Sequence, residues 1–380
     1  VGPSIGSLLL PSIAGAADCA ASAGATYIPF ITLNLSGGPS LASQLVVKNL
    51  SGGNLSSYTK LGLGTGPGLS FNVEKEFGGV EFSGTAIGGN TQGLVSKFLT
   101  GMRDPRNQNM RIAALDKTAF VWSAVALADD TSANQLDVSG LVVKMGLAGS
   151  KLPNLGRQDT ATGINQKPAM VPPPAPFVVG SVADLSNALG YASALQSLSK
   201  NQKTSLARVI SRLSGGQVRR IASTAGADVV GQMVECAGVR NVDLISTGGG
   251  DVSPLALGNA TSTELARIWG INVNDRTSQN AVFASMVYNG LVGNASTVGL
   301  NLGGYDYHDN TRTTGDTRDL AAGRIVGLIL DTAAYLGKPC FVYVCADGAT
   351  VSGESATADS PWMSDRGIAG MQYILAFHPA

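Results

Sequence analysis

Charged side chains are scarce in this chain of 380 residues. Asp, Glu, Lys and Arg make up 14% of it, whereas they make up about 25% of an ordinary soluble domain. The 26 basic residues balance the 26 acidic ones, so the formal net charge is zero. A broad basic face for nucleic acid needs an excess of Lys and Arg, so we expect no nucleic-acid partner. A neutral surface instead favours association between copies, and we expect a homo-oligomer or a polymer.

Histidine is almost missing, with His308 and His378 as the only two. A zinc site with three His ligands is therefore excluded within one subunit. Long apolar runs are scarce as well. The apolar stretch from Ile5 to Leu10 is far too short to cross a bilayer. We therefore expect no transmembrane segment.

The first 25 residues are mostly apolar or small. After the apolar stretch come a proline and small residues up to Ala17, an order similar to the later part of an export signal. We expect an exported protein, located in the periplasm, at the cell surface or outside the cell. Residues 1–25 would form an apolar arm that docks either on its own domain or on a neighbouring copy.

There are four cysteines, Cys19, Cys236, Cys340 and Cys345. An even number in an exported protein allows up to two disulfides with three possible pairings, and four buried thiols are the alternative. Cys340 and Cys345 lie five positions apart on one apolar run. In a strand they would face opposite sides of the sheet, so we do not expect them to pair with each other.

Hydrophobic residues are plentiful, at 44% of the chain, and can form a sizeable core. The predicted organisation after the arm is a single α/β domain over residues 26–380, with Gly/Ser-rich irregular insertions at about 41–90 and 151–180. The second insertion contains the stretch PPPAP, which fits neither a helix nor a central strand.

Hydrophobic patterning predicts the elements of this domain. We expect strands at about 26–35, 140–147, 296–302 and 338–345, a core element at 111–128, and helices at about 91–103, 181–236, 277–291 and 317–336. Strand, long helix and strand over residues 296–345 are typical of a βαβ crossover, so the predicted fold is α/β with a largely parallel sheet flanked by helices. Four arginines at 208, 212, 219 and 220 indicate a solvent-exposed helix face.

Polar side chains follow two of the predicted strands. Asp306 and His308 come directly after the strand at 296–302, and Asp347 follows the strand at 338–345. Functional loops lie beyond the carboxyl ends of parallel strands, and carboxylates with an imidazole are ligands for a divalent cation. The alternative is a polar loop that caps the next helix, with Asp316 or Thr317 at the N-cap.

Four stretches together resemble a known family: LNLSGGPS at 33–40, GLNLGGYDYH at 299–308, FVYVCADGA at 341–349 and SDRGIAG at 364–370. They are similar to a family of exported bacterial proteins of unknown function, usually with a twin-arginine signal, that is related to the alkaline phosphatase and sulfatase superfamily. The resemblance implies an alkaline-phosphatase-like fold. It also implies a metal site at Asp306, His308, Asp347 and Asp365, with Ser36 or Ser40 as the nucleophile.

The chain departs from the family pattern at three places. Pro39-Ser40 stands where many relatives have an acidic residue, and the stretch after the strand at 338–345 lacks the family's Arg. The late Asp-His-Gly motif reads Asp365-Arg366-Gly367, so an arginine replaces a metal ligand. In that place Arg366 would pair with Asp306 or Asp347 as a salt bridge. The resemblance therefore implies a degenerate catalytic site.

Three hypotheses about function follow. The first is a non-catalytic, exported structural protein that self-assembles into a filament, sheet or surface layer and needs no cofactor. The second is a hydrolase of phosphate or sulfate esters that depends on a divalent cation. The third is a secreted binding module, for which few aromatic residues are available to line a pocket.

Overall fold

The computed structural model describes a little under half of the chain. The described residues are 28–39, 41, 97–102, 114–126, 149, 152, 154–157, 177–188, 198–221, 252–305, 312–346, 348–351, 363–366 and 369–380. They fall into two compact units that alternate along the sequence. The smaller unit is Val1–Tyr27, Val142–Leu155 and Pro176–Thr297, and the larger unit is Ile28–Leu141, Gly156–Ala175 and Val298–Ala380. The apolar arm lies outside the described residues, and the single domain over 26–380 stays a prediction.

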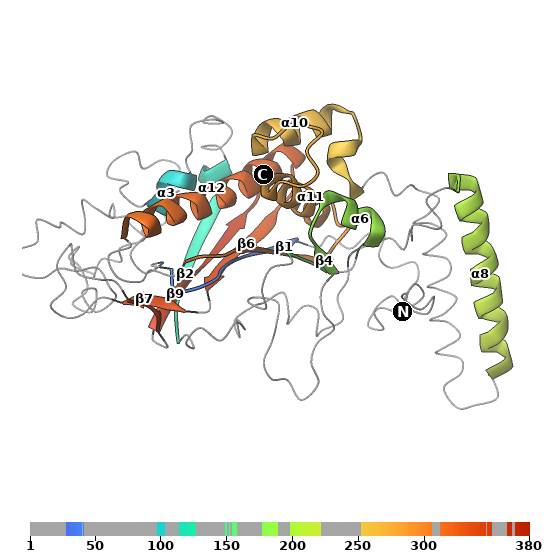
Figure 1. Ribbon diagram of the computed structural model, residues 1–380, viewed down its shortest axis with the longest axis horizontal. Coiled ribbons are helices and arrows are strands. Elements are labelled where there is room, and N and C mark those ends of the chain that lie inside the picture. The colour runs from blue at the N-terminus through green and yellow to red at the C-terminus, as the bar shows by residue number, and fades with distance from the viewer. Residues whose placement is uncertain are drawn as a thin grey trace, which may run out of the picture. The chain divides into compact units, whose positions relative to one another are not determined.

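The fold is α/β, with a mixed, mostly parallel sheet of seven strands (Figure 1). The strand order is β2 (Thr118–Ala126), β9 (Ala369–Phe377), β6 (Cys340–Ala346), β1 (Phe30–Leu35), β5 (Thr297–Leu302), β3 (Leu155–Arg157) and β4 (Phe177–Val179). A separate two-stranded sheet joins β7 (Ala349–Val351) to β8 (Met363–Arg366). The expected α/β class is thereby confirmed.

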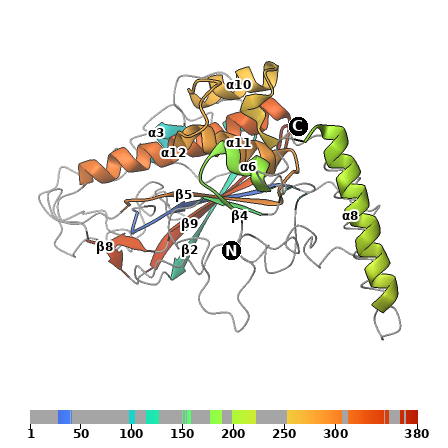
Figure 2. The same ribbon diagram turned by 45° about the vertical axis from the view of Figure 1, so that its right-hand side comes forward.

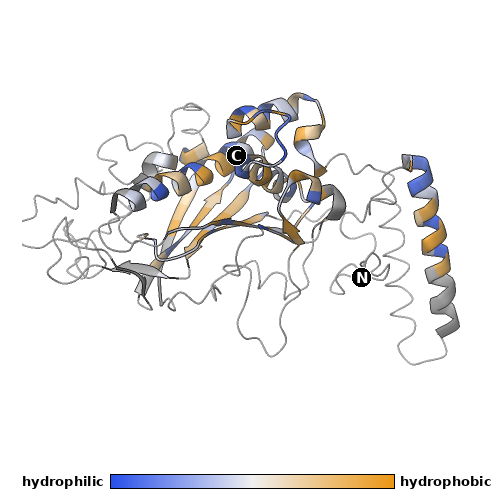
Figure 3. Ribbon diagram, in the orientation of Figure 1, coloured by the Kyte–Doolittle hydropathy of each residue, from blue (hydrophilic) through white to orange (hydrophobic). Residues whose placement is uncertain are grey.

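The centre of the larger unit is the parallel pair β1 and β6, with a register from Phe30↔Phe341 to Leu35↔Ala346. Both strands are apolar runs, and residues on both of their faces are buried, as strands inside a parallel sheet require. Beyond β6, strand β9 pairs antiparallel with β6 and also with β2. The apolar character of the strands is visible in Figure 3.

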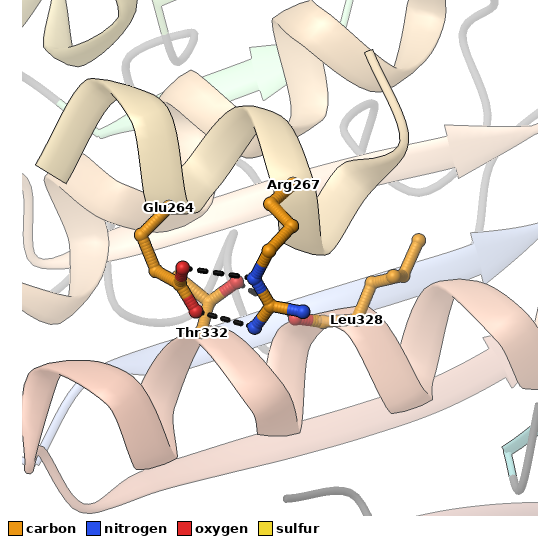
Figure 4. A network of polar contacts seen from close by, with 4 residues as sticks. All are labelled: Glu264, Arg267, Leu328 and Thr332. Carbon is orange, nitrogen blue, oxygen red and sulfur yellow. Dashed lines mark hydrogen bonds and ion pairs between the residues drawn. The ribbon is translucent and has the colours of Figure 1, made fainter. Parts of the chain in front are cut away.

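Two helices, α3 (Lys97–Met102) and α12 (Arg312–Leu336), lie together on one face of this sheet in both views (Figures 1 and 2). They approach closely because glycines stand at the contact. A Cβ on Gly323 would overlap the carbonyl oxygen of Phe98, and one on Gly101 would overlap that of Leu320. Within α12 the buried Thr332 hydroxyl donates to the Leu328 carbonyl oxygen at 2.7 Å (Figure 4), so this polar group stays paired inside the core.

The smaller unit contains α6 (Val182–Ala188), α8 (Lys200–Ile221), a 3-10 turn at Pro254–Ala256, α10 (Ala260–Trp269) and α11 (Gln279–Leu291). Helix α11 begins where Ser278 accepts a hydrogen bond from the Ala281 amide at 3.2 Å. Helix α10 carries an ion pair between Glu264 and Arg267 at 2.5 Å (Figure 4). Hydrogen bonding to Arg267 lowers the pKa of Glu264.

Most of the expected elements agree with these bounds. The strands β1, β5 and β6 and the helices α11 and α12 are confirmed, while α3 covers only part of the helix expected at 91–103. The strand expected at 140–147 falls outside the described ranges. Helix α12 begins at Arg312, so Asp316 and Thr317 lie inside it and the expectation that one of them is its N-cap is wrong. Among the described helices, none is both long and apolar enough to cross a membrane.

Candidate functional site

The loops after β1, β5 and β6 meet at one edge of the sheet in the larger unit. The Ser36 amide donates to the Leu302 carbonyl oxygen at 2.9 Å, and the Tyr305 amide donates to the Ser36 carbonyl oxygen at 3.0 Å. The Gly348 amide donates to the Gly37 carbonyl oxygen at 3.2 Å. The expectation that the loops after β5 and β6 lie at one edge of the sheet is confirmed for their described parts, and the loop after β1 lies between them. Ligands of open α/β sheets bind beyond the carboxyl ends of the strands, so this edge is the candidate site.

Three neutral polar side chains form a row across the ends of the strands. Asn301 on β5 accepts a hydrogen bond from Asn34 Nδ2 on β1 at 3.0 Å. Cys345, which is the register partner of Asn34 on β6, donates through Sγ to Asn34 Oδ1 at 3.7 Å. All three side chains are buried. We call Asn34, Asn301 and Cys345, together with Ser36, the strand-end network.

Of the two expected nucleophiles, Ser36 and Ser40, the structure describes Ser36. Its hydroxyl donates to Asn301 Oδ1 at 2.8 Å, so that one amide oxygen accepts from both Ser36 and Asn34. A serine becomes a nucleophile when a base such as imidazole or carboxylate takes its proton. An amide oxygen is far too weak a base to do so, and this hydrogen bond holds the β1 loop against β5.

The loop after β5 is fixed by Tyr305 and Arg318. The Tyr305 hydroxyl donates to the Arg318 carbonyl oxygen at 2.8 Å. Burial and the charge of the buried Asp319 raise the pKa of Tyr305, so the phenol stays protonated and keeps this hydrogen bond. Gly304 has φ +84°, a conformation that favours glycine, and the Arg318 guanidinium occupies the place of its missing Cβ. A cationic side chain therefore lies against this loop.

The expected metal ligands are not brought together by the described residues. Asp306, His308 and Asp347 lie outside the described ranges, as does the second expected nucleophile, Ser40. Asp365 lies on β8, where the backbone register pairs Arg366 with Ala349 on β7. This register brings the late motif beside the segment that follows β6. Within the described ranges there is no group of three or more His, Cys, Asp or Glu residues that would hold a metal ion.

The donors described at the site do not fit a divalent cation by themselves. Hard cations take several oxygen ligands, carboxylates above all. The strand-end network offers amides, one hydroxyl and one thiol, and their polar atoms bond to one another. We therefore derive no chemical step through a metal, and the ligand set Asp306, His308, Asp347 and Asp365 stays a prediction.

The two described cysteines are buried on β6 as thiols and not as a disulfide. They are not bonded to each other, as expected for Cys340 and Cys345 on opposite sides of a strand. Burial raises the pKa of Cys340 to about 12, which keeps this thiol protonated and unreactive. Cys19 and Cys236 lie outside the described ranges.

Sequence reasoning missed Asn34, Asn301 and Arg318. A signal for the two asparagines was present, because both strands end in Leu-Asn-Leu shortly before Gly-Gly. In adjacent parallel strands, the same position of a repeated motif places the two side chains next to each other on one face. Arg318 had no comparable signal, since its place depends on how the start of α12 lies against the β5 loop.

No family model, curated protein or solved structure matches this chain. The resemblance to the alkaline phosphatase and sulfatase superfamily therefore rests on the sequence motifs alone.

Proposed function

We propose that this chain is an exported, non-catalytic structural protein that self-assembles on an alkaline-phosphatase-like α/β scaffold. The products would be filaments, sheets or a surface layer. The proposal combines two properties: a sheet edge suited to pairing between copies, and a strand-end network whose groups hold the loops in place.

The observation that carries the proposal is strand β2. It is the terminal strand in the order of the described strands, and its nine residues, TAFVWSAVA, include neither a charge nor a proline (Figures 1 and 2). Ala119, Val121 and Ser123 alternate along it as exposed positions, and Val121 is 55% exposed. Edge strands of monomers are usually protected by charge, proline or a bulge, because a long uncharged edge pairs with another chain. The edge of β2 therefore favours strand addition between copies.

The overall charge supports the same proposal. With 14% charged residues and a net charge of zero, like-charge repulsion between copies is weak. A contact made by the β2 edge of one copy on a different surface of the next is heterologous, and such contacts continue into open polymers when the rotation does not close.

Electron microscopy of the native protein tests assembly. We expect ordered filaments or sheets for the wild type and their loss in Val121→Lys, which places a charge on the edge strand. Tyr335→Lys is the matched control, because it places the same charge at an exposed apolar residue of α12. A wild type without ordered assemblies would contradict the proposal, and so would assemblies that Val121→Lys leaves intact.

A hydrolase of phosphate or sulfate esters is the second candidate. It is favoured by Ser36 at the end of β1 and by the Arg318 guanidinium beside the β5 loop, since a serine and an arginine suit an anionic ester. The test is ester hydrolysis with added divalent cations by the wild type, Ser36→Ala and Asp306→Asn. Activity that both variants lose would establish the hydrolase and overturn the non-catalytic proposal. Equal background rates in all three proteins would exclude the hydrolase.

A further inference from the structure

Helix α8 concentrates positive charge in an otherwise balanced chain. Its basic residues are Lys200, Lys203, Arg208, Arg212, Arg219 and Arg220. It has no acidic residue, and the nearest ones along the chain are Asp184 and Asp228. The segment thus carries six of the 26 basic residues of a protein whose net charge is zero.

The same helix exposes apolar side chains. Leu206, Val209 and Leu213 are 36%, 50% and 65% exposed. At 100° per residue these three positions lie within about 60° of one another around the helix, and the two leucines are about 10 Å apart along its axis. They form a stripe, which we call the α8 stripe. Figure 3 shows apolar and polar residues following each other along the described part of α8.

Two exposed arginines of α8 lie to one side of this stripe. At 100° per residue, Arg212 lies about 60° beyond Val209 at the edge of the stripe, and Arg208 lies about 40° further around the helix. The buried positions Thr204 and Ala207 lie on a different side of the helix. Between Leu206 and Leu213, the described exposed surface of α8 therefore combines an apolar stripe with arginines on one side and no acidic residue, which differs from the mixed charges that normally cover a solvated helix.

The helix is held at its start by a reciprocal cap. The backbone amide of Gln202 donates to the Ser199 hydroxyl oxygen at 3.3 Å, and the backbone amide of Ser199 donates to Gln202 Oε1 at 2.8 Å. This capping box satisfies amides that a helix N-terminus otherwise leaves unpaired. The cap stabilises the first turn of the helix that carries the stripe.

We propose that α8 docks on an anionic lipid surface. An apolar stripe bordered by arginine and lysine is the arrangement of helices that lie in the membrane interface. The α8 stripe would enter the boundary between headgroups and acyl chains, while Arg208 and Arg212 reach outward to lipid phosphates. A nucleic-acid partner would contact the arginines but would leave the α8 stripe exposed to water. It would therefore explain the basic residues of α8 and not its exposed apolar ones.

Vesicle co-sedimentation of the full chain tests this proposal. We expect binding to vesicles of phosphatidylcholine with phosphatidylglycerol, little binding to phosphatidylcholine alone, and loss of binding at high salt. Removing both charges in Arg208→Gln/Arg212→Gln should weaken binding about 30-fold, at about fivefold for each charge. Leu206→Ser/Leu213→Ser should weaken it about tenfold or more, because the apolar contact is lost.

Two matched variants elsewhere in the smaller unit serve as controls. Arg267→Gln removes an exposed charge from α10, and Val178→Ser removes an exposed apolar side chain from β4. Both should bind vesicles like the wild type, and circular dichroism should show that all variants are folded. Equal binding to both kinds of vesicle would overturn the proposal. So would α8 variants that bind like the wild type, or a duplex DNA probe that binds more tightly than the anionic vesicles and still binds Leu206→Ser/Leu213→Ser.

Discussion

Asn289 in the smaller unit and Asn301 in the larger unit are both buried asparagines at the centre of a polar network, but their surroundings differ. Asn289 is fully enclosed, and its Nδ2 donates to the carbonyl oxygens of Val252 at 2.9 Å and Ser285 at 2.7 Å. Its Oδ1 accepts from Asn294 Nδ2 at 2.8 Å. Asn301 instead lies at the end of a strand and binds Ser36, which is half-buried in a loop.

Asn289 therefore has a purely structural role, whereas Asn301 lies at the candidate site. The bonds of Asn289 and Asn294 fasten the turn that leads from α11 to β5. The strand-end network stands where an α/β enzyme has its reacting groups, yet it is built from the same uncharged amides. Each unit therefore has a buried network made by neutral hydrogen bonds, in keeping with the low charge content of the chain.

The largest expected effect is on Asn289. Replacing it with alanine removes three side-chain hydrogen bonds and leaves the Asn294 amide without its acceptor. Since all of these groups are buried, we expect Asn289→Ala to lower the free energy of unfolding by about 3 kcal/mol. Urea unfolding measures the change. Asn274→Ala, at an exposed asparagine, is the control and should change it by less than about 0.5 kcal/mol. Similar values for the two variants would show that the enclosed network adds little stability.

A smaller effect is expected at Asn301. Asn301→Ala removes the oxygen that accepts from both Asn34 and Ser36, and we expect a loss of about 2 kcal/mol in the free energy of unfolding. Because Ser36 is half-buried, water can replace part of the lost hydrogen bonding, so the free energy of unfolding should fall less than in Asn289→Ala. A loss larger than that of Asn289→Ala would reverse the comparison between the two networks.

Ser36→Ala should have a smaller effect again. Asn301 Oδ1 keeps its hydrogen bond from Asn34 when the bond from Ser36 at this half-buried site is lost. We expect a loss of about 1 kcal/mol or less in urea unfolding. The double variant Ser36→Ala/Asn301→Ala should then be less destabilised than the sum of the two single variants, because the bond between them is counted once. Strict additivity would mean that the two side chains do not interact.

The smallest effect concerns acid. The hydrogen bonds of both networks come mainly from amides, whereas the carboxylate of Asp275 before α11 accepts hydrogen bonds from the amides of Thr277 and Ser278, each at 3.0 Å. The hydrogen bond from the Ser278 side chain, followed by those from the two backbone amides, lowers the pKa of Asp275 below its ordinary value of 3.8. The unfolded chain therefore binds the proton more readily, and the contribution of Asp275 is complete above the ordinary pKa and is lost as pH falls through the lowered one.

Asp275→Asn keeps an acceptor oxygen but cannot titrate. Urea unfolding over a series of acid pH values should show the stability of the wild type falling slightly more steeply than that of the variant below pH 3.8. Identical slopes would mean that the carboxylate is not stabilised in the folded protein.

Local signals explain which parts of the fold were predictable. Helix α11 has a serine cap and an apolar run. In β5, α12 and β6, which follow it, the spacing of the hydrophobic residues changes clearly between that of a strand and that of a helix. Strand β9 was not predicted, although it is the partner of both β2 and β6. Its place depends on pairing with segments far away in the sequence, and no local pattern of Ala369–Phe377 identifies those partners.

The candidate site was predictable in position but not in composition. The loops after β5 and β6 were expected at one edge because the carboxyl ends of parallel strands share it, and only the family resemblance implied that the loop after β1 belongs there. The bond between Asn34 and Asn301 joins residues 267 positions apart, and only the repeated Leu-Asn-Leu motif indicated it. The predicted site residues were ionisable or nucleophilic, and asparagine is neither.

The native mass of the protein tests the central proposal most directly. Sedimentation velocity over a range of protein concentrations should give a mass well above that of one chain, 38.7 kDa. The mass should rise with concentration and change little with salt, since a charge-poor edge makes the contact. Val121→Lys should return it to the mass of one chain. A wild type that sediments at 38.7 kDa at every concentration would contradict self-assembly.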